Sequence, residues 1–134
     1  MSLSDIPRPN NIDAIVSELL WLTNQIKEFH WFHDDAKKHE ILGKLYDSFS
    51  EKVDEFVEVY MGMYPDEKST SRSLLPALKP YEQDPALVPA FFQTMADYIK
   101  LLGKDVRVQD TDLLNVVQDM GNQLERTRYL YRMK

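Results

Sequence analysis

The stretch from Ala36 to Gly62 reads AKKHEILGKLYDSFSEKVDEFVEVYMG and is the longest helical pattern in the sequence. Its apolar residues recur at steps of three and four, which is typical of one buried helical face. These residues are Leu42, Leu45, Phe49, Val53, Phe56 and Tyr60. At about 1.5 Å per residue, the helix would be close to 40 Å long. Helices of this length in a small domain usually belong to a bundle, so the stretch predicts a helical bundle.

A second helical pattern precedes this stretch. We expect a helix that follows the turn-like segment PRPNN, has Asn10 or Asn11 as its N-cap and ends near Phe32. Trp31, close to its end, is expected to anchor either the core or an interface. The apolar residues of this helix also share one face, and they are Ile12, Ile15, Leu19, Leu22, Ile26 and Phe29.

Two further helices are expected in the C-terminal half of the chain. One covers Ala86–Leu102, with Asp84 as a cap signal before it and Gly103 as its end. The other opens at Asp110 or Thr111. Its predicted buried face consists of Leu113, Val117, Met120, Leu124 and Tyr131.

The segment MYPDEKSTSRSLLPALKPYEQDP separates the second helix from the third. Its four prolines and its Ser/Thr cluster predict a loop, with one short helical turn around Leu74 to Leu78. A connection this long indicates a crossover that spans the bundle. The only strand-like stretch, DVRVQD from Asp105, is short and lies between two helical patterns. The sequence therefore predicts one all-α domain over residues 1–134, a four-helix bundle with a long crossover between helices 2 and 3.

Composition narrows the classes of function. The chain has 134 residues, no cysteine and a net charge of -6, from 22 acidic and 16 basic residues. The absence of cysteine excludes disulfides, thiolate metal sites and cysteine nucleophiles. The negative charge argues against broad binding to nucleic acid, whose affinity comes mostly from neutralised phosphates. No apolar run approaches the roughly 20 residues that cross a bilayer, and the start MSLSDIPRPN lacks the features of a signal peptide. We expect a soluble, cytoplasmic protein.

Histidines and carboxylates are the candidate metal ligands. All three histidines, His30, His33 and His39, fall within the seventeen residues FHWFHDDAKKHEILGKL, and no Glu-x-x-His motif is present. Further along the second helix, carboxylates step by four, three and four: Asp47, Glu51, Asp54 and Glu58.

These two groups are too far apart to meet within one chain. Glu58 follows His39 by 19 residues, which corresponds to about 28 Å along a straight helix. Two copies packed antiparallel across a two-fold axis would bring His39 of one copy near Asp54 and Glu58 of the other. A metal site built from these residues therefore implies a homodimer.

Ordinary structural roles are the alternative for each residue. His30 could be a half-buried residue at a helix end, hydrogen-bonded to a carbonyl. His33 lies in the expected link between helices, where a solvated position is expected. His39 could form a local pair with Asp35, one turn earlier. The acidic residues could form a solvated face, which the nearby Lys44 and Lys52 would favour.

Several motifs together resemble the ferritin-like Dps family, the DNA-protecting mini-ferritins of bacteria. They are NQIKEFHWF, with His30-Trp31 at the end of the first helix, and HEILGKLYDSFSEKVDEFVE, with His39-Glu40, Leu45-Tyr46, Asp54-Glu55 and Glu58. The start of the last helix, DTDLLNVVQDM, also resembles the family. The resemblance implies a ferritin-like bundle and an iron-oxidising site at a two-fold dimer interface.

Matched motif by motif, the resemblance assigns His30 and His39 as ligands from one subunit and Asp54 and Glu58 as ligands from the other. The family's fifth ligand, an aspartate four residues after the second histidine, is replaced here by Gly43. The lysine-rich N-terminal tail with which many family members hold DNA has no counterpart in MSLSDIPRPN.

Two functional hypotheses follow. In the first, the protein is a Dps-like homo-oligomer that binds iron or a similar divalent metal between subunits, with ferroxidase activity if the site is intact. In the second, it keeps the fold without a working metal site and acts as a non-catalytic helical oligomeric or interaction protein. Phrases such as KKHEILGKLYDSF and VEVYMGMYP also resemble small ferritin-like proteins encoded by phages, and this kinship is compatible with either hypothesis.

Overall fold

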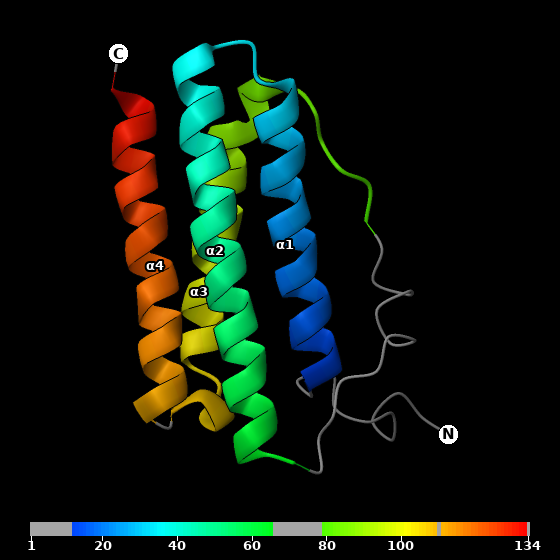
Figure 1. The fold of residues 1–134 in the computed structure, drawn as a ribbon, viewed down its shortest axis with the longest axis vertical. Coiled ribbons are helices and arrows are strands. Elements are labelled where there is room, and N and C mark those ends of the chain that lie inside the picture. The colour runs from blue at the N-terminus through cyan, green and yellow to red at the C-terminus, as the bar shows by residue number, and fades with distance from the viewer. Residues whose placement is uncertain (1–11, 66–78, 110, 134) are drawn as a thin grey trace.

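A computed structural model describes residues 12–65, 79–109 and 111–133 (Figure 1). In this part of the chain, four long helices are accompanied by two short 3-10 helices. The long helices are α1 (Ile12–Phe32), α2 (Ala36–Met63), α3 (Val88–Gly103) and α4 (Thr111–Arg132), and the 3-10 helices are η3 (Pro85–Leu87) and η4 (Val106–Val108).

The four long helices pack side by side as a bundle. Helices α1 and α4 run in one direction, and α2 and α3 run in the other (Figure 1). The closest packing joins α1 to α2, α2 to α4 and α4 to α3. Because α2 and α3 are parallel, the connection between them must return from one end of the bundle to the other. The prediction of an all-α four-helix bundle with a long connection between helices 2 and 3 is therefore confirmed.

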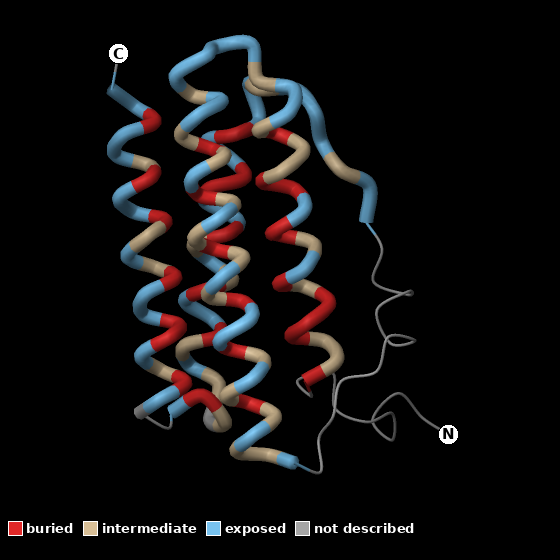
Figure 2. Tube along the Cα trace, viewed as in Figure 1, coloured by how far each residue is buried: buried red, intermediate tan, exposed pale blue. Residues whose placement is uncertain are grey.

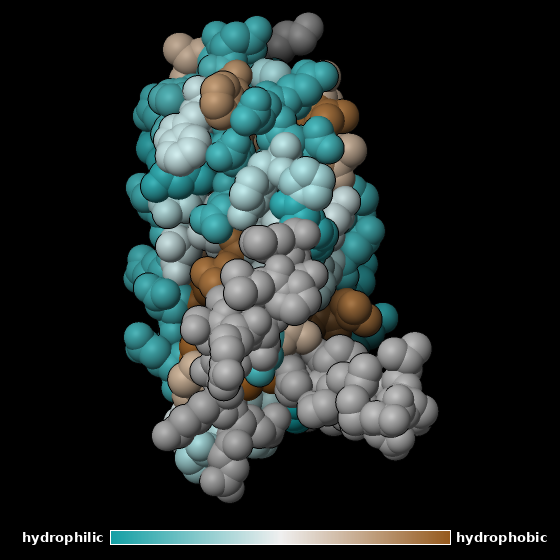
Figure 3. All heavy atoms as spheres, turned by 90° about the vertical axis from the view of Figure 1, so that its right-hand side faces the viewer, coloured by the Kyte–Doolittle hydropathy of each residue, from teal (hydrophilic) through white to brown (hydrophobic). Residues whose placement is uncertain are grey.

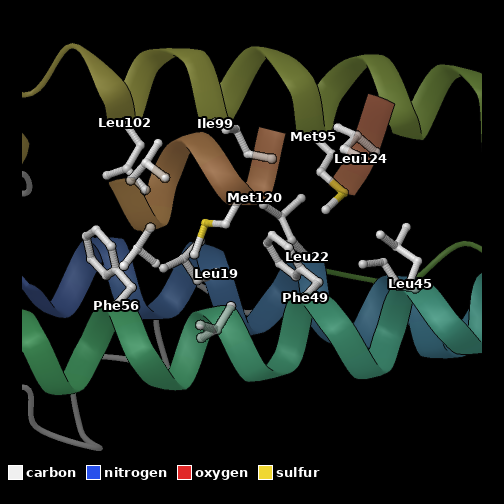
Figure 4. Close-up of a cluster of buried hydrophobic side chains, with 14 of the residues drawn as sticks. Leu19, Leu22, Leu45, Phe49, Phe56, Met95, Ile99, Leu102, Met120 and Leu124 are labelled. Carbon is white, nitrogen blue, oxygen red and sulfur yellow. The ribbon is translucent and has the colours of Figure 1, made fainter. Parts of the chain in front are cut away.

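The core follows the apolar stripes of the four helices. Buried positions face the centre of the bundle and exposed positions face outward (Figure 2). Every apolar residue predicted to be buried on the first, second and fourth helices is buried. In the middle of the bundle, side chains from all four helices meet (Figure 4), among them Leu19, Leu22, Leu45, Phe49, Phe56, Met95, Ile99, Leu102, Met120 and Leu124.

Local side-chain contacts determine where the helices begin. Asp35 is the N-cap of α2, and its carboxylate accepts a hydrogen bond from the backbone N–H of Lys38. Asp84 accepts one from the backbone N–H of Ala86, but it caps the 3-10 helix η3 rather than an α-helix. The predicted start of the third helix at Ala86 was therefore wrong by two residues, since α3 begins at Val88.

Other boundaries agree with the sequence or lie outside the described residues. Helix α1 ends at Phe32 as predicted, and α2 continues one residue beyond the predicted Gly62. The strand-like DVRVQD contains the 3-10 helix η4. The predicted N-cap at Asn10 or Asn11 and the helical turn around residues 74–78 lie outside the described residues.

The described end of the crossover, residues 79–84, lies along α1. Gln25, buried on α1, donates to the carbonyl of Glu82 and accepts from the Glu82 backbone N–H, each at 2.8 Å. The indole N–H of Trp21 donates to the carbonyl of Lys79. On the visible part of this side of the molecule, hydrophobic residues form separate small groups among hydrophilic ones (Figure 3). Among the described residues, no helix is both long and apolar enough to span a membrane.

Candidate metal centre

The structure brings His30 and His39 together at the junction of α1 and α2. Their rings are stacked, with centroids 4.0 Å apart and an interplanar angle of 18°. Each Nδ1 bonds the backbone carbonyl of the other residue, at 2.7 Å for His30 Nδ1 to His39 O and 2.5 Å for His39 Nδ1 to His30 O. The expectation that His30 is bonded to a carbonyl is confirmed. The expected local pair between His39 and the Asp35 side chain was wrong, because Asp35 caps α2 instead.

These two hydrogen bonds determine which ring nitrogen remains available. A carbonyl can only accept, so Nδ1 carries the proton in both rings. In the neutral form of each ring, Nε2 then holds a free lone pair. Histidines that bind metals usually have this arrangement, with one N–H donated to a carbonyl or carboxylate and the other nitrogen facing the ion. The pair therefore presents two imidazole nitrogens of the kind that divalent transition metals bind.

Gly43 makes room for this pair. A Cβ at position 43 would lie 2.8 Å from His30 Cε1 and 3.0 Å from His30 Nδ1, which is closer than such contacts normally occur. Gly43 has no positive φ, so space and not backbone conformation is the reason for glycine here. An aspartate at this position, as in the Dps pattern, is incompatible with the observed place of the His30 ring. Glycine at position 43 and the stacked histidines therefore depend on each other.

Both histidine rings line an open pocket on the surface between α1 and α2, together with Gly43. Seven further residues of the two helices complete the lining: Lys27, Trp31, Ala36, Glu40, Lys44, Tyr46 and Asp47. The Lys27 ammonium lies 4.4 Å from the centroid of the Tyr46 ring and 5.5 Å from that of Trp31, and it donates to the Tyr46 hydroxyl at 3.3 Å. Contacts of this kind hold the ammonium by cation–π attraction. Trp31 is 55 % exposed, so the expectation that it anchors the core was wrong, and its role at an interface stays a prediction.

The side chain of His33 is buried instead of solvated, although the residue as a whole is half-buried, so that expectation was wrong. Only 5 % of its side chain is exposed. Its Nδ1 accepts the backbone N–H of Asp35 at 3.1 Å, which leaves Nε2 to donate to the Tyr131 hydroxyl at 2.8 Å. Burial lowers the pKa of the imidazole, although Asp34 and Asp35 act in the opposite direction. This histidine ties the α1–α2 link to the end of α4 and is not part of the pocket.

Four of the acidic residues of α2, the ones that step by four, three and four, are exposed. Within the described parts of the chain, none of the four has an ion-pair partner. Lys52 bonds Glu55 and Asp119, and Lys44 bonds Glu40, so these two nearby lysines pair with other carboxylates. The four unpaired residues, which we call the acidic stripe, are Asp47, Glu51, Asp54 and Glu58.

One chain thus carries two separated halves of the predicted site. His30 and His39 are in contact, whereas Asp54 and Glu58 lie further along α2. No group of three or more potential ligands that could hold a metal ion occurs among the described residues of a single chain. The contacts of Lys27 and of His33 could not be read from the sequence, because both depend on partners from other helices.

Comparisons with models of protein families, with curated proteins and with solved structures found no significant match. We call the stacked pair of His30 and His39, together with Gly43, the histidine corner.

Proposed function

We propose that the chain is a ferritin-like protein of the Dps type that forms an antiparallel homodimer along α2 and binds iron, or a similar divalent metal, between the two copies. His30 and His39 of one copy would supply nitrogen ligands, and Asp54 and Glu58 of the second copy would supply oxygen ligands. The observation that carries the proposal is the stacked pair of histidines, each with Nδ1 bound to a carbonyl.

The arrangement of the bundle supports this proposal. Its single long crossover, with α1 and α4 antiparallel to α2 and α3, is the connection found in ferritin-like folds. The histidine corner and the acidic stripe both involve the exposed side of α2. A two-fold axis across this side would place the corner of each copy against the stripe of the other.

The register of the two antiparallel α2 helices determines which residues of one copy lie near the histidines of the other. Where two α2 helices run antiparallel with Glu58 opposite His39, the same register sets Asp54 opposite Gly43. Gly43 lines the pocket and has no side chain. The carboxylate of Asp54 would thus reach the open side of the pocket at the level of Gly43, the position at which this chain lacks the fifth family ligand.

The ligand set suits a divalent transition metal. Imidazole nitrogen suits ferrous iron and zinc, and carboxylate oxygen favours the harder ferric ion. In this arrangement the carbonyls of His30 and His39 would keep both rings oriented, and Gly43 would leave room for the His30 ring. If the bound metal is ferrous iron, the carboxylates would stabilise its ferric form relative to its ferrous form.

A second candidate function is supported by a specific observation. The described part of one chain has no group of three potential ligands, and the family's fifth ligand is absent at Gly43. Both facts favour a helical oligomeric or interaction protein in which the stacked histidines only join α1 to α2.

Anaerobic titration of the apo protein with ferrous iron separates the two candidates. We expect saturable binding near one or two ions per chain, abolished by His39→Ala. The matched control is His33→Gln, which removes a histidine outside the pocket while its amide can keep both hydrogen bonds of the imidazole. Wild-type binding no stronger than that of His39→Ala would overturn the metal proposal and favour the second candidate.

A further inference from the structure

Lys27 is a half-buried cation without a carboxylate partner among the described residues. Its ammonium is held between the Trp31 and Tyr46 rings at the edge of the histidine pocket. A partly desolvated charge of this kind is stabilised strongly by an opposite charge brought to it. The surface around Lys27 therefore fits an acidic partner.

The acidic stripe supplies the opposite charge on the same protein. Its carboxylates are exposed and have no cation of their own among the described residues. One copy therefore carries both an unpaired cation and unpaired anions: Asp47 lines the same pocket as Lys27, whereas Glu51, Asp54 and Glu58 lie further along α2. Such a surface is complementary to itself when a second copy is turned end for end.

The register of the proposed dimer identifies the partner of Lys27. The antiparallel pairing that sets Glu58 at the height of His39 and Asp54 at the height of Gly43 also places Glu51 of the second copy at the height of Tyr46. Tyr46 is the residue against which the Lys27 ammonium lies, at 3.3 Å from its hydroxyl oxygen. Glu51 is not among the residues proposed to bind the metal.

We infer that Lys27 of each copy forms an ion pair with Glu51 of the other, twice per dimer, and that these pairs hold the dimer together without metal. The inference rests on the antiparallel dimer of the proposed function. The two ion pairs fix the register before any ion binds, so that Asp54 and Glu58 already face the histidines. Metal then binds to a preassembled site instead of bringing the subunits together.

Charge reversal tests this pairing. In EDTA and at low salt, Lys27→Glu and Glu51→Lys should each weaken the dimer by about tenfold or more, because each homodimer then has two like-charged contacts. An equimolar mixture of the two variants should recover dimers, because a mixed dimer has one native pair and one reversed pair. Sedimentation velocity measures the dimer, and native mass spectrometry with one variant labelled with 15N identifies the mixed species.

Two comparisons control for changes in net charge and in folding. Lys100→Glu on α3 changes the charge equally at an exposed position away from α2 and should leave the dimer unchanged. Circular dichroism of each variant establishes that the helices persist. The mixture provides a further control, because two variants that fail to dimerise through misfolding would not form dimers when they are mixed.

The possible outcomes separate this inference from the metal proposal. Variants that dimerise like the wild type, or a mixture without mixed dimers, would overturn the Lys27–Glu51 pairing. A wild-type chain that is monomeric in EDTA but forms a dimer with iron would also overturn it, while leaving the shared metal site intact. Recovery of mixed dimers by a protein that binds no iron would support the pairing and overturn the metal site.

Discussion

The centre of the bundle and the histidine corner use different interactions to join the same helices. In the centre, apolar side chains from all four helices pack without any polar contact being needed (Figure 4). At the corner, α1 and α2 are joined by two reciprocal bonds from imidazole to carbonyl and by a glycine that makes room for a ring. The stability of the centre depends on how completely side chains fill its volume, and that of the corner depends on the exact position of the His30 and His39 rings. Substitution by alanine should therefore change the free energy of unfolding for different reasons in the two regions.

The largest effect is expected in the centre. Leu22 is fully buried, and Leu22→Ala should lower the free energy of unfolding by about 2–5 kcal/mol, because it removes apolar contacts and leaves a cavity. Leu20, on the same helix, is 38 % exposed, and Leu20→Ala should cost less than about 1 kcal/mol. Urea denaturation of both variants measures the difference. Equal costs would show that the centre is not packed as described.

Gly43 tests the corner in the opposite sense. Alanine is normally about 0.5–1 kcal/mol better than glycine inside a helix. At Gly121, where a Cβ would lie 3.7 Å from Ile99, Gly121→Ala should gain this amount. Gly43→Ala should instead lose about 1 kcal/mol, because the new methyl group displaces the His30 ring from its hydrogen bond.

A double substitution sharpens this result. If the His30 ring is the cause, Gly43→Ala should become stabilising in a His30→Ala background, as at Gly121. The free energy of unfolding of the four proteins in this cycle gives the coupling directly. A coupling near zero would mean that another feature of α2 requires the glycine.

The sequence predicted the centre well and the surroundings of His33 poorly, and the reason is physical. The stripe from Leu42 to Tyr60 has a helical period, and period alone decides which side of a helix is buried. No such rule applies to His33, whose surroundings were expected to be solvent. Tyr131, its partner, comes from the far end of the chain, and its predicted burial did not reveal that its hydroxyl would meet an imidazole.

Only those parts of the candidate site that lie close together in the sequence could be predicted. His30 and His39 lie at the ends of consecutive helices joined by a short link, so their contact follows from the turn of the chain. The position of Lys27 between Trp31 and Tyr46 could not be predicted in this way, because Tyr46 comes from the other helix. The arrangement of Asp54 and Glu58 toward the histidines depends on a second copy and stays a prediction.

The smallest expected effect concerns pH and the buried His33. Burial lowers its pKa below the value of 6.5 that applies to the unfolded chain. Between these two values the unfolded chain binds more protons than the native protein, so the free energy of unfolding decreases as the pH falls. Above 6.5 the contribution of this group is complete. The protein should therefore lose thermal stability when the pH falls from 7.5 toward 5.5.

His33→Gln isolates the contribution of this group from that of every other titrating residue. The glutamine amide can donate to Tyr131 and accept from the Asp35 backbone N–H, so at pH 7.5 the variant should remain within about 1 kcal/mol of the wild type. At pH 5.5 the difference should shift in favour of the variant, because glutamine takes up no proton while the imidazole must gain one where Nδ1 already accepts an N–H. Thermal unfolding of both proteins across this range measures the shift. If the thermal stabilities of the two proteins instead changed in parallel with pH, the native structure would not oppose protonation of His33, and its burial would carry no cost for a charged imidazole.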